Sequence, residues 1–140
     1  MAQLEKFVFS PNRPDGNWIN WRIRSGWFEV AGVEHRLEDV LNFLRSAAEA
    51  NDKGLSFGVA LEAEPDNPHH TNAIKVLGFT ECDNGQRSSY HIGYIPRETA
   101  NQVAELYSDT PLAAELRQAK IGDFKIIVSV AGLIPKGTPK

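Results

Sequence analysis

At 140 residues and 15.5 kDa, the chain has the size of one ordinary domain, which can bury a hydrophobic core without disulfides or metals. A composition of 41% hydrophobic and 24% charged residues excludes disordered and fibrous classes, and the length excludes a multidomain enzyme. The net charge of −3 removes the general argument that a strongly basic surface binds nucleic acid, so any such site has to be local.

The first 26 residues lack a clear period and carry a cluster of turn residues, which predicts an extended arm followed by a first strand. Three tryptophans, Trp18, Trp21 and Trp27, are interleaved with Arg22 and Arg24. Aromatic faces and guanidinium groups in such a pattern can form a stacking platform for unpaired bases. The alternative is a strand whose aromatic face packs on the domain while its arginines face solvent, and we favour this interpretation.

The rest of the sequence predicts strands and helices from its periodicity. Alternating or β-branched runs indicate strands, and apolar residues at i, i+3, i+4 and i+7 indicate helices. The expected strands cover residues 28–33, 55–62, 72–79, 90–95 and 124–130. One expected helix of about 14 residues ends before Gly54, and a second follows a cap at Thr99.

Two stretches of the sequence lack the clear periodicity of a strand or a helix. Residues 80–87 are hydrophilic and contain the turn dipeptide Asn84-Gly85, so we expect a loop. Residues 111–119 are ambiguous between a helical turn and an edge strand. The whole pattern predicts a mainly β, α+β fold, a small barrel with two appended helices, which spacing alone does not separate from other α+β sandwiches.

The densest group of polar and aromatic residues lies in the run LEAEPDNPHHTNAIKV, residues 61–76. Its rigid, proline-containing loop joins two predicted strands, a position from which a scaffold presents a binding site. This run resembles the central signature of the HIRAN domain family. Residues 30–36 and 92–100 are similar, in the same order, to the opening turn and the second signature of that family, and the chain resembles its short standalone bacterial and phage-type members.

The resemblance implies an OB-like β-barrel of about six strands with two appended helices that binds single-stranded DNA or a DNA 3′ end. It implies an accessory role in DNA repair or processing, with a helicase or nuclease as partner, because family members occur fused to such enzymes. It divides the chain into an arm with a possible first strand (1–26), a HIRAN-like domain (27–132) and a tail (133–140).

Carried over by position, the resemblance implies a nucleic-acid-binding pocket built from the Gly32 turn, the proline-containing loop and the second signature. Its residues are Glu34, His35, Arg36, Asn67, His69, His70, Tyr94 and Arg97. The implied roles are phosphate contact for Arg36 and Arg97, base stacking for His35, His69 and Tyr94, and hydrogen bonding to a terminal nucleotide for Asn67 and His70.

Several of these positions depart from the pattern of a well-understood family member. Glu34 replaces a cation, and a carboxylate there repels phosphate unless an arginine screens it. His35, Arg36 and His69 replace tyrosines, and His70 replaces an aspartate. These replacements favour a cationic cleft that stacks bases over strict recognition of a 3′ end. A protein-interaction module that has lost DNA binding, and a metal-dependent hydrolase acting on nucleic acid, are the alternatives.

Motifs of metal sites and enzymes are missing from the sequence. His69, His70 and His91 with Cys82 lack the spacing of zinc ligands, so we expect no metal. There is no GxxxxGK[ST] loop and no GxSxG elbow, so we expect neither an enzyme nor a cofactor. A single cysteine forms no intrachain disulfide, and no apolar run approaches the length of a membrane span, so we expect a cytoplasmic protein.

Overall fold

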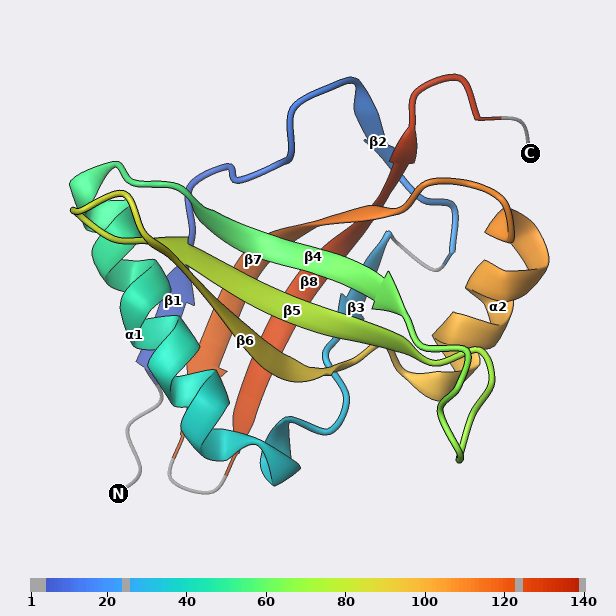
Figure 1. Cartoon of the computed structure of the whole chain (residues 1–140), viewed down its shortest axis with the longest axis horizontal. Helices are drawn as coiled ribbons and strands as arrows, with labels where there is room; N and C mark the ends of the chain where they lie inside the picture. Colours follow the sequence, from blue (N-terminus) through green and yellow to red (C-terminus); the bar gives the residue numbers. More distant parts are fainter. Residues whose placement is uncertain (1–4, 24–25, 123–124, 139–140) are drawn as a thin grey trace.

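The computed structural model describes residues 5–23, 26–122 and 125–138. Over these residues the elements in chain order are β1 (Glu5–Val8), β2 (Trp18–Asn20), β3 (Trp27–Glu29), the 3-10 helix η1 (Val33–His35), α1 (Leu37–Lys53), β4 (Phe57–Ala63), β5 (Ile74–Glu81), β6 (Arg87–Tyr94), α2 (Arg97–Tyr107), β7 (Ala113–Ile121) and β8 (Ile126–Pro135). Figure 1 shows the helices α1 and α2 at opposite ends of the strands. The prediction of a mainly β, α+β fold is confirmed.

The strands form two antiparallel sheets (Figure 1). The large sheet has the order β1-β7-β8-β2, with β3 also paired to β8, and the small sheet has the order β4-β5-β6. Ala31 forms an isolated bridge to Tyr94 that links the two sheets on one side. On the other side β4 lies beside β7, but no ladder joins them in the described part of the chain. The pairing thus leaves the expected barrel unclosed, and eight strands take the place of about six.

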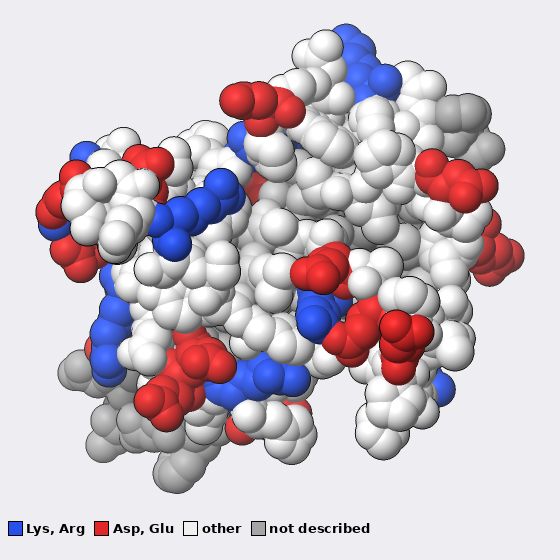
Figure 2. Space-filling view, in the orientation of Figure 1, with Lys and Arg blue, Asp and Glu red and all other residues white. Residues whose placement is uncertain are grey.

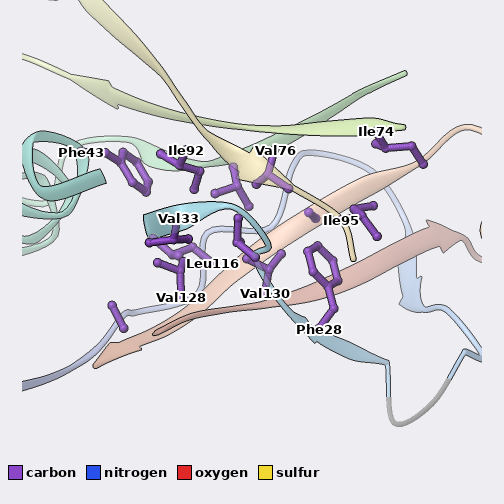
Figure 3. Packing of buried hydrophobic residues seen from close by; sticks show 14 of the residues in the cluster. Phe28, Val33, Phe43, Ile74, Val76, Ile92, Ile95, Leu116, Val128 and Val130 are labelled. Carbon is purple, nitrogen blue, oxygen red and sulfur yellow. The ribbon is translucent and has the colours of Figure 1, made fainter. Parts of the chain in front are cut away.

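The hydrophobic core lies between the two sheets (Figure 3). Val76 and Ile92 of the small sheet face Leu116 and Val128 of the large one, and all four are essentially inaccessible to solvent. Phe43 of α1 extends this core at one end. Burying each such side chain contributes roughly 1.5–3 kcal/mol, so the two sheets form a rigid support for the loops at their ends.

Helix α1 confirms that residues 37–53 are helical, but its buried face differs from the expected one. Apolar spacing predicts Leu37, Val40, Leu41, Leu44 and Ala48 in the core, whereas Leu37 is exposed and the buried residues are Val40, Phe43, Leu44, Ala47 and Ala50. The helix has 17 residues rather than about 14: it runs from Leu37 to Lys53 and ends at Gly54, which is in the left-handed conformation with φ of 69°. The start of α1 therefore places Arg36 at the junction between the Gly32 turn and the helix.

Three local predictions need correction. Thr99 does not cap the second helix, because α2 begins at Arg97 after Pro96, and Thr99 is buried within the helix. The ambiguous stretch 111–119 contains most of β7, which is an interior strand paired with both β1 and β8. Strands β5 and β6 extend into the expected loop 80–87 and leave a short hairpin turn that contains Gly85 at φ of 82°.

Two short strands of the N-terminal arm belong to the large sheet, since β1 pairs with β7 and β2 pairs with β8. Trp21 is buried against Gly132, where a Cβ would lie 2.2 Å from the indole ring. Trp27 is 37% exposed, with the Arg117 guanidinium 5.0 Å from its ring. Trp21 therefore packs and does not join a common stacking platform. Arg24 and the predicted strand position Phe124 lie outside the described residues, and the division at residues 26 and 132 stays a prediction.

Candidate functional site

Tyr94 ends β6 at the place where the two sheets meet. The Ala31 N–H donates to the Tyr94 carbonyl at 2.8 Å, and the Tyr94 N–H donates to the Ala31 carbonyl at 2.9 Å. Gly93 permits this approach, because a Cβ there would lie 2.3 Å from the Ala31 carbonyl oxygen and its φ of +154° disfavours other residues. The bridge therefore holds the Gly32 turn next to Tyr94.

A carboxylate organises the side chains around Tyr94. The Tyr94 hydroxyl donates to Glu64 Oε1 at 2.9 Å, and Asn67 Nδ2 donates to the same oxygen at 2.7 Å. The other oxygen, Oε2, lies 3.0 Å from Lys75 Nζ. Lys75 is directly opposite Tyr94 in the register of β5 and β6. Together with Arg36, these four residues form what we call the tyrosine cluster.

The contacts within the cluster set its protonation states. Hydrogen bonds from Lys75, Asn67 and Tyr94 lower the pKa of Glu64 to about 2. The hydrogen bond to Glu64 raises the pKa of Lys75, and burial followed by the same carboxylate raises the pKa of Tyr94. At neutral pH the cluster holds a carboxylate, an ammonium and a protonated phenol. A carboxylate with so low a pKa is a weak general base.

We expect the Glu64 contacts to stabilise the fold in a pH-dependent way. The pKa of Glu64 is lowered from 4.5 to about 2 on folding, so its contribution is complete above pH 4.5 and is lost as the pH falls towards 2. Glu64→Gln should therefore destabilise the protein at pH 6, and the difference from wild type should shrink between pH 4.5 and pH 2. Urea denaturation at several pH values measures this difference.

The neighbouring residue Glu62 provides the control for that prediction. Glu62 is exposed and directly opposite Lys75 in the register of β4 and β5, but the hydrogen bonds of the cluster go to Glu64. Glu62→Gln should have a much smaller effect on the free energy of unfolding. A Glu64→Gln destabilisation that is equal at pH 6 and pH 2.5 would show that the carboxylate does not hold the cluster.

Asn67 shapes the loop between β4 and β5. Its Oδ1 accepts hydrogen bonds from the backbone N–H of His69 at 2.8 Å and of His70 at 3.1 Å, an Asx-type turn. The Asn67 N–H in turn donates to the Glu64 carbonyl at 3.0 Å. These hydrogen bonds fix the loop conformation, and the His69 side chain is exposed to solvent.

The same loop is tied to helix α2. His70 Nε2 lies 2.8 Å from Asn101 Oδ1, and Asn72 Nδ2 donates to the same oxygen at 3.1 Å. His70 is half-buried, while Asn101 is on the exposed side of α2. The position of α2, which begins at Arg97, is therefore coupled to the loop.

Arg36 brings a cation to the tyrosine cluster. Its Cζ lies 5.8 Å from the centroid of the Tyr94 ring, and the His91 ring meets the same ring edge-on at 5.0 Å. Burial and then the positive charge of Arg36 lower the pKa of His91, which favours its neutral form. Among the described residues, no carboxylate forms an ion pair with Arg36, whereas Lys75 is paired with Glu64.

The surface around the cluster is mixed in charge. Figure 2 shows small groups of acidic and basic side chains on this face and no continuous basic surface. Electrostatic attraction of a polyanion over a long range is therefore weak, and recognition depends on placed arginines. Arg36 is half-buried and Arg97 is exposed at the start of α2.

The structure brings part of the predicted pocket together. Arg36, Tyr94 and Asn67 are linked through the ring contact and Glu64, and the amides of His69 and His70 are held by Asn67. The remaining predicted residues lie on exposed ends of helices: Glu34 and His35 on η1, 3.6 Å apart, and Arg97 on α2. Within the described ranges, none of these three shares a hydrogen bond, ion pair or ring contact with the tyrosine cluster. The assigned roles stay predictions.

Sequence reasoning did not place Glu64, Lys75, His91 and Asn101 in the site. The register of the strands makes Glu62 the direct neighbour of Lys75, yet the ion pair forms with Glu64 beyond the end of β4. A register shift at Val76/Leu77, opposite Gly93 and His91, sets which β6 residues face the site, and Gly93 inside the predicted strand is a local signal for such an irregularity.

No group of three or more His, Cys, Asp or Glu side chains among the described residues is placed to hold a metal ion. None of the helices described is long and apolar enough to cross a membrane.

The family model described as HIRAN domain matches residues 28–122, which run from β3 to the end of β7 and contain the whole tyrosine cluster. Neither the curated proteins nor the solved structures give a significant match to the chain.

Proposed function

The chain belongs to the HIRAN domain family, whose domains bind nucleic acid, and we propose that it recognises single-stranded DNA, at or near a 3′ end, through the tyrosine cluster. The observation that carries this proposal is the Arg36 guanidinium 5.8 Å from the Tyr94 ring, both at the surface and not fully buried. A half-exposed ring can stack on a base, and a guanidinium fork suits a phosphate.

The loop beside the cluster supports a role for the end of the strand. His69 projects from a loop that Asn67 holds rigid, and His70 is oriented by Asn101. An exposed imidazole can stack on a base, and an oriented one can hydrogen-bond a sugar hydroxyl. Arg97, exposed at the start of α2, supplies a second cation near the loop. Glu34 is exposed on η1, where its carboxylate repels phosphate groups that approach this helix.

The proposed mode is recognition without bond breaking. Its support is chemical: the carboxylate nearest to Tyr94 has a pKa of about 2 and accepts three hydrogen bonds or ion-pair contacts, so it is poorly suited to remove a proton. Family members occur fused to helicases and nucleases, and we propose that this chain is likewise an accessory to an enzyme that repairs or processes DNA. We also propose that the fold is related to the OB-like barrel, because the two sheets enclose a common core.

The test is a comparison of strand ends. Fluorescence anisotropy of a labelled single strand with a 3′-hydroxyl should give tighter binding than the same strand with a 3′-phosphate, because the phosphate esterifies the hydroxyl that His70 is proposed to bind. Equal affinities would leave single-strand binding intact and reject end recognition. Absence of binding to both strands at low salt would favour the protein-interaction alternative.

A further inference from the structure

The face of the small sheet that points away from the core is an extension of the tyrosine cluster. Register places Tyr94, Leu77 and Phe79 on this face, because directly opposite residues share a face: Lys75 with Tyr94, Leu77 with His91, and Phe79 with Ser89. Helix α1 packs on the opposite face, where the rings of Phe43 and Tyr90 lie 5.8 Å apart. Leu77, Phe79 and His91 are half-buried, so planar and apolar groups reach the surface here.

An ordered cation lies at the far end of this face. The Arg87 guanidinium stacks 3.9 Å from the centroid of the Phe79 ring. The ring itself rests on Gly58 of β4, where a Cβ would lie 3.0 Å from it. Arg87 is exposed, and it forms no ion pair with a carboxylate among the described residues, including Glu81 directly opposite in register. The charge of Arg87 is therefore held in place and free to meet an anion.

A groove continues from this end of the sheet. Its volume is about 840 Å³, and it lies between residues 10–15 with Trp18 on one side and β4 with Phe79 and Arg87 on the other. Figure 2 shows the surface hollowed over this part of the small sheet. The groove meets the outer face of the small sheet at Phe79 and Arg87, while Leu77, His91 and Tyr94 lie outside its lining.

We infer that a single strand of nucleic acid bound at Tyr94 continues across the outer face of the small sheet, over Leu77 and His91, and that a backbone phosphate meets Arg87. The inference rests on the proposed function. Arg87 and Tyr94 are seven residues apart on β6, which at ~3.3 Å per residue is roughly 23 Å, the reach of several nucleotides. Planar groups on a sheet face, with Arg36 at one end and Arg87 at the other, fit a ligand with rings and regularly spaced anionic groups.

The length of the strand provides the test. A thymidine dodecamer reaches Arg87 from Tyr94, and a trimer does not. Arg87→Ala should weaken binding of the dodecamer by about three- to tenfold and leave the trimer within about twofold of wild type, both measured by competition against a labelled strand. Arg87→Glu, which places a like charge near phosphate, should weaken dodecamer binding further. Arg45→Ala, at an exposed position on α1, is the matched control and should change neither affinity.

The outcomes separate this inference from the proposed function. Arg36→Ala should weaken both strands if the cluster binds the end of the strand. Suppose that Arg87→Ala and Arg87→Glu leave the dodecamer affinity unchanged while Arg36→Ala weakens binding of both strands. This result would overturn the path to Arg87 and leave the proposed function at the tyrosine cluster intact. Failure of the wild-type protein to bind either strand would overturn the proposed function and the inference with it.

Discussion

Replacing Tyr94 with alanine is expected to weaken binding of single-stranded DNA by about 1–3 kcal/mol, which is roughly a 5- to 150-fold increase in Kd. The loss has two physical sources. The ring that stacks on a base is removed, and Arg36 loses the aromatic face 5.8 Å away that orients its guanidinium. Anisotropy titration with a labelled thymidine dodecamer measures the change.

Tyr94→Phe is the matched variant for this prediction. It keeps the ring and removes only the hydroxyl that donates to Glu64 at 2.9 Å. We expect Tyr94→Phe to retain most of the affinity, because stacking depends on the ring and Lys75 and Asn67 still hold the carboxylate. Both variants should show the far-UV circular dichroism of wild type. A folded Tyr94→Ala protein with wild-type affinity would exclude base stacking at this residue.

The sequence predicts the elements of the fold that depend on local periodicity. Helix α1 follows from apolar spacing, and Gly54 ends it as expected. Strands β1 and β2 are harder to predict, because both are short and are stabilised by pairing with β7 and β8 at the other end of the chain. Thr99 resembles a helix cap, but its burial inside α2 shows that Pro96 and tertiary packing decide where the helix begins.

The candidate site is predictable only in part for a similar reason. Family resemblance points to Arg36, Asn67 and Tyr94, and the structure links them. The link itself is Glu64, and its partner Lys75 is brought to Tyr94 by strand register. The pairing register is a tertiary property, so a single sequence contains no local signal for it, although Gly93 inside a predicted strand indicates the irregularity opposite Val76.

Arg36→Ala is expected to have the second large effect, because Arg36 is the cation of the cluster without a carboxylate partner in the described residues. Its removal should weaken binding of single-stranded DNA by about five- to tenfold at low salt. It should also make the salt dependence shallower, since each phosphate contact on a single strand contributes about 0.7 to the slope of log K against log salt. Arg45→Ala should leave both quantities unchanged.

The most direct test of the account is therefore a salt series of anisotropy titrations with wild-type protein and Arg36→Ala. If Arg36, Arg87 and Arg97 each meet one phosphate, the wild-type slope should be about −2, and Arg36→Ala should reduce its magnitude by about 0.7. A folded wild-type protein that does not bind single-stranded DNA at low salt would contradict the account, as would an Arg36→Ala protein with the affinity and salt slope of wild type.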